Sequence, residues 1–323
     1  MEQDVLSILE EHFQNYVSGE EMARRLFMTR ANVWKEIKKL RKQGYEILSS
    51  TQKGYCLQKR ADYLSGSLIS GFLDPGTLDG LEVLPTVDST NSFAKKLAAK
   101  DSDISDFLIL SEEQTQGRGR RERSFFSPAG TGIYMSFILR PAALRIQDVQ
   151  LLTICAALAV CEAVESLLSV KADIKWLNDV YAGGKKLCGI LTEGDIELEL
   201  LRYRYVIVGI GINTKSKGVS LPPDLSKIYT ALDKHTRLPI DRNRLAAEVT
   251  NAFYRYYRNL TDREEIIERY KARSNVLGKI VTLNQESAPL YRAVDISPEG
   301  HLIVEDEERK RIELNAGEVS MKG

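Results

Sequence analysis

The sequence predicts a multidomain α+β protein. The chain has 323 residues, more than a single domain usually holds, which favours two or three domains. Helix patterns followed by a hairpin pattern occupy residues 1–62, strands and helices mix over 63–274, and short strands fill 275–323. Strands paired through turns and then covered by helices are typical of α+β folds rather than of strictly alternating ones.

Composition excludes a strongly basic or acidic protein, because 45 Lys and Arg balance 45 Asp and Glu. Any nucleic-acid surface must therefore be a local patch. The four cysteines form no CxxC pair, which disfavours metal and dithiol chemistry, and Cys155 and Cys161 read as small core residues. The acidic N-terminus resembles no signal peptide, and no apolar run is expected to span a bilayer. We expect a cytoplasmic protein without membrane association.

The first 62 residues begin with three helix patterns. Ser18 followed by Glu21 is a capping-box signature for the second helix. Thr29 is a suitable N-cap for the third. The apolar positions at helical spacing in the first and third patterns are Val5, Leu9, Phe13, Val33, Ile37 and Leu40.

A hairpin pattern completes this segment. Gln43–Gly44 should end the third helix, because glycine is favoured just past a helix end. Strands are expected at Tyr45–Leu48 and Gly54–Leu57, around a polar turn. Three helices followed by a hairpin is the order of a winged helix-turn-helix.

The third helix pattern lies in a basic stretch. Residues 24–42 hold Arg or Lys at eight positions, opposed only by Glu36. Such a cluster suits contacts to DNA phosphates, and the start of a recognition helix meets base edges. A solvated face of a protein-binding module is the alternative. The candidate DNA-binding residues are Thr29, Arg30, Asn32, Lys35, Lys38 and Lys39.

The remaining patterns mix strands and helices. Helices are expected over Asp148–Leu168 and from Arg242 toward Tyr257. The tail strands predict a small β-barrel. Central strands are predicted at Leu81–Val87, Phe107–Leu110, Ile133–Leu139, Lys186–Leu191 and Tyr205–Ile212, and tail strands at Lys279–Leu283, Tyr291–Ile296, His301–Val304 and Arg309–Leu314.

The strongest chemical signal is the arginine loop, residues 116–121 (QGRGRR). Two glycines allow close approach of backbone to a ligand, and arginines bind phosphate with forked donors. Glycine-arginine runs also occur in nucleic-acid-binding tails, but this one lies inside a globular pattern. It matches neither a Walker loop nor a dinucleotide fingerprint. By itself it indicates only an anion site, with phosphate the natural anion.

Three further segments carry polar or glycine signals. Residues 88–91 (DSTN) lie at a strand-to-helix junction, where they could bind a ligand or merely cap the helix. Residues 175–190 (KWLND followed by GGKKLCGI) could bring amide, carboxylate and ammonium together, or could be a polar hairpin turn. Residues 208–213 (VGIGIN) place glycines in a strand, which suggests close approach of a ligand or of a neighbouring backbone.

Together and in this order, these segments resemble biotin protein ligases that carry an N-terminal repressor head. The resemblance covers nearly the whole chain. It implies a mixed-sheet ligase domain of the biotin/lipoyl ligase type and an SH3-like C-terminal barrel that helps bind ATP and the acceptor. It implies that ATP and Mg²⁺ activate biotin to biotinyl-5′-AMP, which is both intermediate and corepressor. The partners are a biotin carboxyl carrier domain of acetyl-CoA or pyruvate carboxylase, operator DNA, and a second copy in an adenylate-bound homodimer.

The resemblance also assigns residues. Lys186, with Arg118, Arg120 and Arg121, would stabilise charge during catalysis. The ATP-binding set is Arg118, Arg120, Arg121, Asn178, Asp179 and Asn213, with Asp179 as the Mg²⁺ ligand. The biotin-binding set is Ser89, Thr90, Asn91, Gln114, Gly117, Tyr134, Ser136, Lys186, Gly189, Gly209 and Gly211.

Three positions depart from the family pattern. Glu122 replaces a glycine, Phe125 an indole and Leu177 a proline. Three alternatives also stay open at this level: a ligase with a vestigial or protein-binding head, a ligand-sensing repressor without catalysis, and a lipoyl-type ligase. The arginine loop and the attached head favour biotin.

Overall fold

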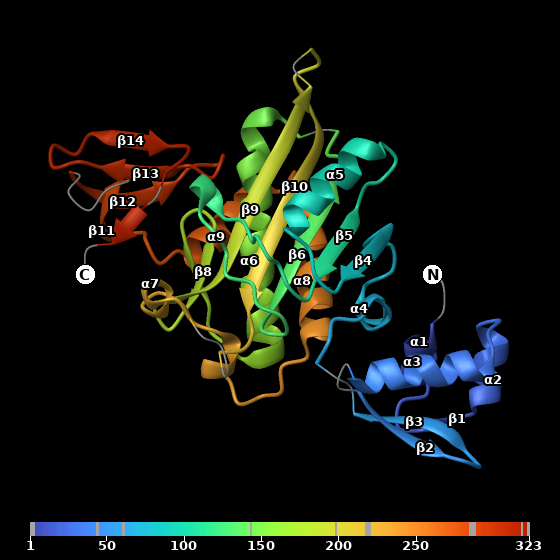
Figure 1. Ribbon diagram of the computed structural model, residues 1–323. Coiled ribbons are helices and arrows are strands. Elements are labelled where there is room, and N and C mark those ends of the chain that lie inside the picture. Colours follow the sequence, from blue (N-terminus) through green and yellow to red (C-terminus); the bar gives the residue numbers. More distant parts are fainter. Residues whose placement is uncertain are drawn as a thin grey trace. The chain divides into compact units, whose positions relative to one another are not determined.

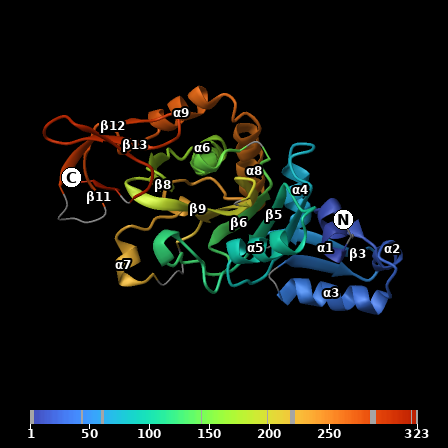
Figure 2. The ribbon, with the colours of Figure 1, turned by 90° about the horizontal axis from the view of Figure 1, so that it is seen from above.

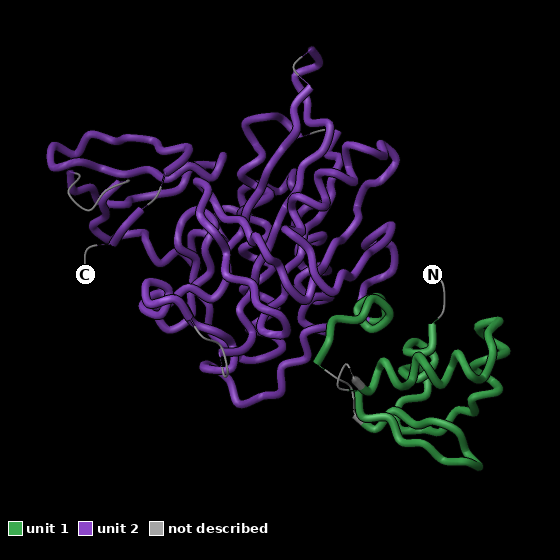
Figure 3. Tube along the Cα trace, in the orientation of Figure 1, with its two compact units in different colours: residues 1–71 green, residues 72–323 purple. Residues whose placement is uncertain are grey.

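The computed structural model describes residues 4–42, 45–59, 62–142, 144–197, 199–216, 221–283, 289–317 and 319–321. The chain divides into two compact units, residues 1–71 and 72–323 (Figure 3). The predicted helix end at Gln43–Gly44 lies outside the described residues.

Unit 1 has the predicted order of three helices and a hairpin. Ser18 Oγ accepts from Glu21 N at 3.0 Å and Thr29 Oγ1 from Asn32 N at 3.2 Å, which confirms both helix starts. A strand that was not predicted, β1, pairs with the hairpin to give the order β1-β3-β2. The elements are α1 (Val5–Glu11), β1 (Tyr16–Val17), α2 (Gly19–Arg25), α3 (Arg30–Lys42), β2 (Glu46–Ser50), β3 (Gly54–Lys59) and α4 (Gly66–Phe72).

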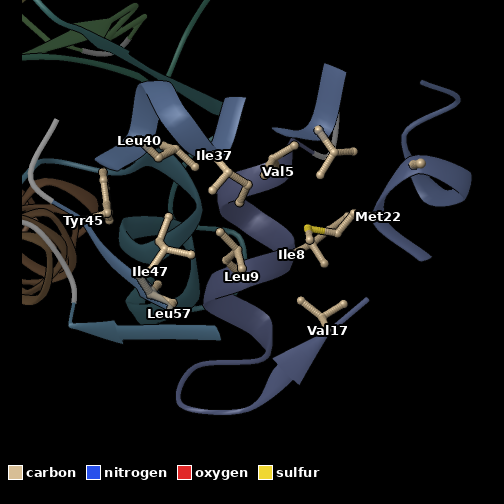
Figure 4. Close-up of a cluster of buried hydrophobic side chains, with 12 residues drawn as sticks. Val5, Ile8, Leu9, Val17, Met22, Ile37, Leu40, Tyr45, Ile47 and Leu57 are labelled. Carbon is tan, nitrogen blue, oxygen red and sulfur yellow. The ribbon is translucent and has the colours of Figure 1, made fainter. Parts of the chain in front are cut away.

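The core of unit 1 follows the apolar spacing of its helices. Val5 and Leu9 of α1 face Ile37 and Leu40 of α3, and Leu57 of β3 closes the cluster (Figure 4). These five side chains are at most 7% exposed. The basic face of α3 is thereby left outside the core.

Unit 2 is built on a seven-stranded mixed sheet, ordered β4-β5-β6-β10-β9-β8-β7. Only the β4–β5 pair is parallel among the strand pairs described for this sheet. The strands are β4 (Gly80–Leu84), β5 (Phe107–Ser111), β6 (Gly132–Leu139), β7 (Asp173–Lys175), β8 (Asp179–Ala182), β9 (Lys185–Glu197) and β10 (Arg202–Asn213). All five predicted central strands are present, and β9 runs further than predicted.

Helices cover both faces of this sheet (Figures 1 and 2). α6 and α8 pack together on one face, and α5 lies on the other. The helices of this unit are α5 (Thr90–Lys100), α6 (Val149–Leu168), α7 (Pro223–Ser226), α8 (Arg242–Arg258) and α9 (Arg263–Ala272).

The apolar helix α6 corrects one expectation. The stretch Ile146–Leu168 is long and apolar enough to cross a membrane, contrary to the prediction that no run is. Its most apolar window is 78% buried inside the protein, which is the pattern of a core helix. Cys155 and Cys161 lie fully buried in this helix, as predicted for core residues.

A five-stranded antiparallel sheet ends the chain, ordered β14-β13-β12-β11-β15. Trp176 Nε1 donates to Gly300 O at 2.9 Å and ties this sheet to the segment after β7. Its strands are β11 (Ile280–Leu283), β12 (Leu290–Ile296), β13 (Leu302–Glu305), β14 (Arg311–Leu314) and β15 (Val319–Met321). The first four were predicted, and β15 was not.

Candidate functional site

The site lies on the face of the central sheet that carries α5. Residues directly opposite in antiparallel strands point to the same face. One such row joins Tyr134, Gly211 and Gly189 across β6, β10 and β9, and the next joins Ser136, Gly209 and Leu191. Glycines at the centre of both rows leave a hollow over the middle of the sheet.

Two neighbouring side chains lie close to the glycines of this hollow. A Cβ on Gly209 would lie 2.0 Å from Asn91 Oδ1, and one on Gly211 would lie 2.4 Å from the ring of Phe125. No side chain larger than hydrogen fits either position unless these groups move. The groups that come close to these strand glycines are side chains and not neighbouring backbone, and the predicted approach of a ligand stays a prediction.

The segment Asp88–Asn91 does not cap α5 with its side chains. Ser89 is the N-cap residue but makes no side-chain capping hydrogen bond. Instead, Thr90 N and Oγ1 donate to Gln114 Oε1 at 2.8 and 3.1 Å, and Gln114 Nε2 donates to Ser127 at 2.9 Å. The capping interpretation is wrong for Ser89, because its side chain accepts from no amide of the first helical turn, and Gln114 instead binds the first helical amide, that of Thr90.

Asn91 of α5 is hydrogen-bonded to both β6 and β9. Its Nδ2 donates to Leu191 O at 3.1 Å and to Glu193 Oε2 at 2.9 Å, and its Oδ1 accepts from Ser136 Oγ at 2.7 Å. Asn91 is 4% exposed. These bonds use both donor hydrogens of the amide, so Asn91 shapes the cavity wall without a free hydrogen to offer a ligand.

Two adjoining cavities open on this face. The first, here called the inner cavity, lies over the glycine rows. It contains eight of the predicted biotin-site residues: Ser89, Thr90, Asn91, Gln114, Lys186, Gly189, Gly209 and Gly211. Tyr134 and Ser136 lie on the same sheet face but are buried and do not line the cavity, and Gly117 lines a neighbouring hollow with Arg118.

The second, here called the outer cavity, lies between the arginine loop, the segment after β7 and the C-terminal sheet. Predicted residues in its wall are Arg120, Arg121, Asn178, Asp179, Lys186 and Asn213, joined by Arg123, Lys175, Trp176 and Tyr229, which were not predicted. Gly317 and Val319 reach it from the C-terminal sheet. Asn213 Nδ2 donates to Thr230 O at 3.0 Å, which fixes its side chain in the wall.

Lys186, Arg120, Asn178 and Phe125 line both cavities. Lys186 Nζ lies 2.7 Å from Asp179 Oδ1, and Arg120 donates to Asn178 Oδ1 at 3.0 Å. Two ligands, one bound in each cavity, would therefore meet beside a lysine and an arginine.

The arginine loop is folded back on itself. Phe125 N donates to Gly117 O at 2.8 Å, and Gly119 N to Arg123 O at 2.7 Å. Arg121 and Glu122 have φ values of 54° and 61°. Glycine would adopt this left-handed region without the cost of about 1–2 kcal/mol that other residues incur. Glu122, which replaces a glycine of the family pattern, thus has a backbone conformation that favours glycine.

Phe125, which replaces an indole of the family pattern, keeps an aromatic ring in the site. The ring covers Gly211 and meets Tyr134 edge-on, with centroids 6.4 Å apart. Burial raises the pKa of Tyr134, whose hydroxyl donates to Pro128 O at 3.0 Å. Tyr134 is thus an uncharged support for Phe125 and not a proton donor to a ligand.

Glu193 is a site residue that the sequence reasoning missed. It lies on β9 two residues beyond Leu191, on the same face as Gly189. Burial would raise the pKa of Glu193, but hydrogen bonds from Lys95 and Asn91 outweigh it and hold the pKa below its usual value. The available signal was the spacing along the strand: residues 189, 191 and 193 alternate by two and therefore share one face of β9.

The metal prediction rests on Asp179 and its neighbour Asn178. Among the residues that the structure describes, no group of three or more His, Cys, Asp or Glu could hold a metal. Mg²⁺ is commonly bound through one or two carboxylates together with substrate phosphates and waters. Asp179 in the outer cavity fits that mode and does not fit an all-protein cage.

The predicted DNA-binding residues lie on the exposed face of α3 and at its start. Thr29, Arg30, Asn32, Lys35, Lys38 and Lys39 are all exposed. Arg41 instead donates to Ile47 O and Ser49 Oγ and fastens the β2–β3 wing to the helix. Trp34, which was not predicted, is 52% exposed, with Lys38 Nζ 5.2 Å from its ring centroid.

Comparison with protein families matches three parts of the chain. The Biotin/lipoate A/B protein ligase family matches residues 83–213, an HTH domain residues 2–56, and the Biotin protein ligase C terminal domain residues 276–322. These ranges contain α3, the two cavities' strands and the C-terminal sheet.

Relatives are similar over nearly their full length. The bifunctional ligase/repressor BirA of Bacillus subtilis is 33% identical over 95% of each chain, and that of Escherichia coli is 30% identical over 90% of this chain and 88% of its own. The biotin protein ligase of Aquifex aeolicus in complex with biotin and ATP is 27% identical with a TM-score of 0.63, covering 76% of this chain and 99% of its own.

Proposed function

The chain belongs to the biotin/lipoate A/B protein ligase family, and on that premise we propose how its site makes it a bifunctional biotin protein ligase and biotin-responsive repressor. One observation carries the assignment: two cavities on one sheet face share a wall containing Lys186 and Arg120. An enzyme that joins a carboxylate to a nucleotide phosphate needs this arrangement, since both reactants must meet beside positive charge.

The reaction has two steps. A carboxylate oxygen of biotin attacks the α-phosphorus of ATP, the bond to the bridging oxygen breaks, and pyrophosphate leaves with its electron pair. The side-chain amine of a lysine on a biotin carboxyl carrier domain, of acetyl-CoA or pyruvate carboxylase, then attacks the carbonyl of biotinyl-5′-AMP. AMP leaves, and the amine loses a proton. The nucleophile of each step comes from a substrate.

Biotin occupies the inner cavity in this proposal. Its fused rings lie over the glycine rows near Ser89 and Thr90, and its carboxylate points to Lys186. Lys186 stabilises the negative charge that develops on the carboxylate and the α-phosphate. Hydrogen-bond donors and cations placed where charge develops are the largest contribution in many enzymes.

ATP occupies the outer cavity, with Arg120 and Arg121 at its phosphates and Asn213 and Tyr229 in its wall. Asp179, with Asn178, would hold Mg²⁺, which supplies charge neutralisation on the phosphates. Gly317 and Val319 bring the C-terminal sheet to the nucleotide. We assign this sheet as an SH3-like barrel that also receives the acceptor domain.

Unit 1 is the repressor head. The basic face of α3 enters the major groove of operator DNA and the wing contacts the backbone. Biotinyl-5′-AMP is the corepressor and favours a homodimer that binds two half-sites. The domains are 1–62 for the head, 63–274 for the ligase and 275–323 for the barrel. ATP as a substrate and four buried cysteines that form no disulfide suit a cytoplasmic location.

The first half-reaction tests the ligase assignment directly. Adding biotin to the protein with ATP and Mg²⁺ should release pyrophosphate and leave enzyme-bound biotinyl-5′-AMP, whereas lipoate should release far less. Equal release with lipoate would move the assignment to a lipoyl-type ligase. Biotin binding without any release would favour a sensor without catalysis.

A gel-shift titration tests the head. Biotinyl-5′-AMP should tighten binding to operator DNA, and replacing Arg30 and Lys35 by alanine should abolish the gain. DNA affinity that is unchanged by these substitutions would leave the head as a protein-binding module.

A further inference from the structure

The arginines in and beside the arginine loop do not all line the same cavity. They are Arg118, Arg120, Arg121 and Arg123. Arg118 lines the inner cavity and not the outer one, whereas Arg121 and Arg123 line the outer cavity and not the inner one. Arg120 lines both. Arg118 therefore lies beside the inner cavity, where its ion-pair partner bears on that cavity's wall.

The partner of Arg118 is Glu193. Arg118 Nη2 lies 3.4 Å from Glu193 Oε1, and Lys95 Nζ lies 2.5 Å from the same oxygen. The other oxygen, Oε2, accepts from Asn91 at 2.9 Å. One carboxylate thus joins β9, the helix α5 and the arginine loop.

Burial makes this carboxylate a strong anchor. The side chain of Glu193 is 17% exposed, against 47% for Arg118 and 33% for Lys95. Charged groups that are partly removed from water are retained only when paired and hydrogen-bonded, and such bonds are stronger than neutral ones. Asn91 and Lys95 are one helical turn apart, so both reach Glu193 from the same face of α5.

We propose that Glu193 is a positioning residue of the inner cavity: it fixes the Asn91 amide against Gly209 and holds Arg118 in the cavity wall, and so sets how tightly the ligand binds. Glu193 acts through Asn91 and Arg118 and does not touch the reacting atoms. The inference rests on the proposed assignment of this cavity to biotin.

The test compares three variants of the full-length protein. In Glu193→Gln the amide oxygen can still accept from Asn91, but the charge facing Arg118 and Lys95 is lost. In Glu193→Ala both are lost. The matched control is Glu197→Gln on the same strand, since Glu197 pairs with Arg202 at 3.0 Å and lines neither cavity.

Biotin binding without ATP is measured by calorimetry, and the steady-state KM values for biotin and ATP are measured separately. We expect Glu193→Ala to weaken biotin binding roughly 10- to 100-fold, the factor that one hydrogen bond to a charged group represents. Glu193→Gln should fall between Ala and wild type, and Glu197→Gln should match wild type. The KM for ATP and the kcat at saturating biotin should stay close to wild type.

Separate outcomes overturn the separate claims. If wild type binds no biotin, the cavity assignment and the inference with it are wrong. If wild type binds biotin and folded Glu193→Gln and Glu193→Ala bind it equally well, the positioning role is wrong. Equal increases in both KM values would also overturn it, because a merely structural residue would affect the two cavities alike.

Discussion

Gly209→Ala tests the geometry of the inner cavity. The added Cβ would lie 2.0 Å from Asn91 Oδ1, and backbone in the middle of a central strand cannot retreat. Asn91 must therefore move and lose its bonds to Ser136, Glu193 and Leu191 O. At about 1 kcal/mol for each bond, the free energy of unfolding should fall by about 3 kcal/mol.

Urea unfolding of the catalytic unit measures this loss, and calorimetry should show weaker biotin binding in the same variant. The double variant Gly209→Ala with Asn91→Ala identifies the cause. Truncating Asn91 removes the atom that the new methyl group meets, so the double variant should be no less stable than Asn91→Ala alone. Additive losses would refute the steric reasoning, because the methyl group would then be acting elsewhere.

Three further predictions follow from other parts of the molecule. Trp34→Ala should weaken operator binding without changing the slope of affinity against salt, since an apolar side chain neutralises no phosphate; a changed slope would contradict this. Glu112→Ala should lower the free energy of unfolding by about 3–5 kcal/mol, because it removes the carboxylate that lies 2.9 Å from Arg242, whose charged side chain is 0% exposed; a loss below about 1 kcal/mol would contradict this. The pKa of Glu193 is depressed below 4.5, so the ionised carboxylate should keep stabilising the folded site as pH falls toward 4.5. This contribution to the free energy of unfolding should disappear only below that value. Biotin binding that weakens already between pH 7 and 6 would show that another group controls it.

Local signals in the sequence were enough for most of the fold. The cap at Ser18 and the apolar spacing of Val5 and Leu9 predicted α1 and α2 because both features act within one or two helical turns. Short strands such as β1 and β15 were missed, since two or three residues carry no usable alternation and are held by partners far along the chain.

The site was predicted less completely, for a similar reason. Capping seemed a natural function for residues 88–91 because Ser and Asp favour helix starts, but Gln114, 24 residues further on, binds the Thr90 amide. Glu193 lies in a polar stretch of β9 and becomes a site residue only through Lys95 and Asn91 of α5. The strand spacing could have indicated the face on which Glu193 lies, but its partners lie 98 and 102 residues away, so the bonds themselves could not be predicted from a local pattern.

Lys186 is proposed to stabilise charge where the contents of the two cavities meet. Transfer of labelled biotin to a carrier domain, with ATP and Mg²⁺, tests it in Lys186→Ala against the neighbouring control Lys185→Ala. Lys185 is exposed and lines neither cavity. We expect normal transfer for Lys185→Ala and a loss of roughly 10²–10³ in kcat for Lys186→Ala, as for removal of one stabilising donor. Equal transfer rates in the two variants would contradict it.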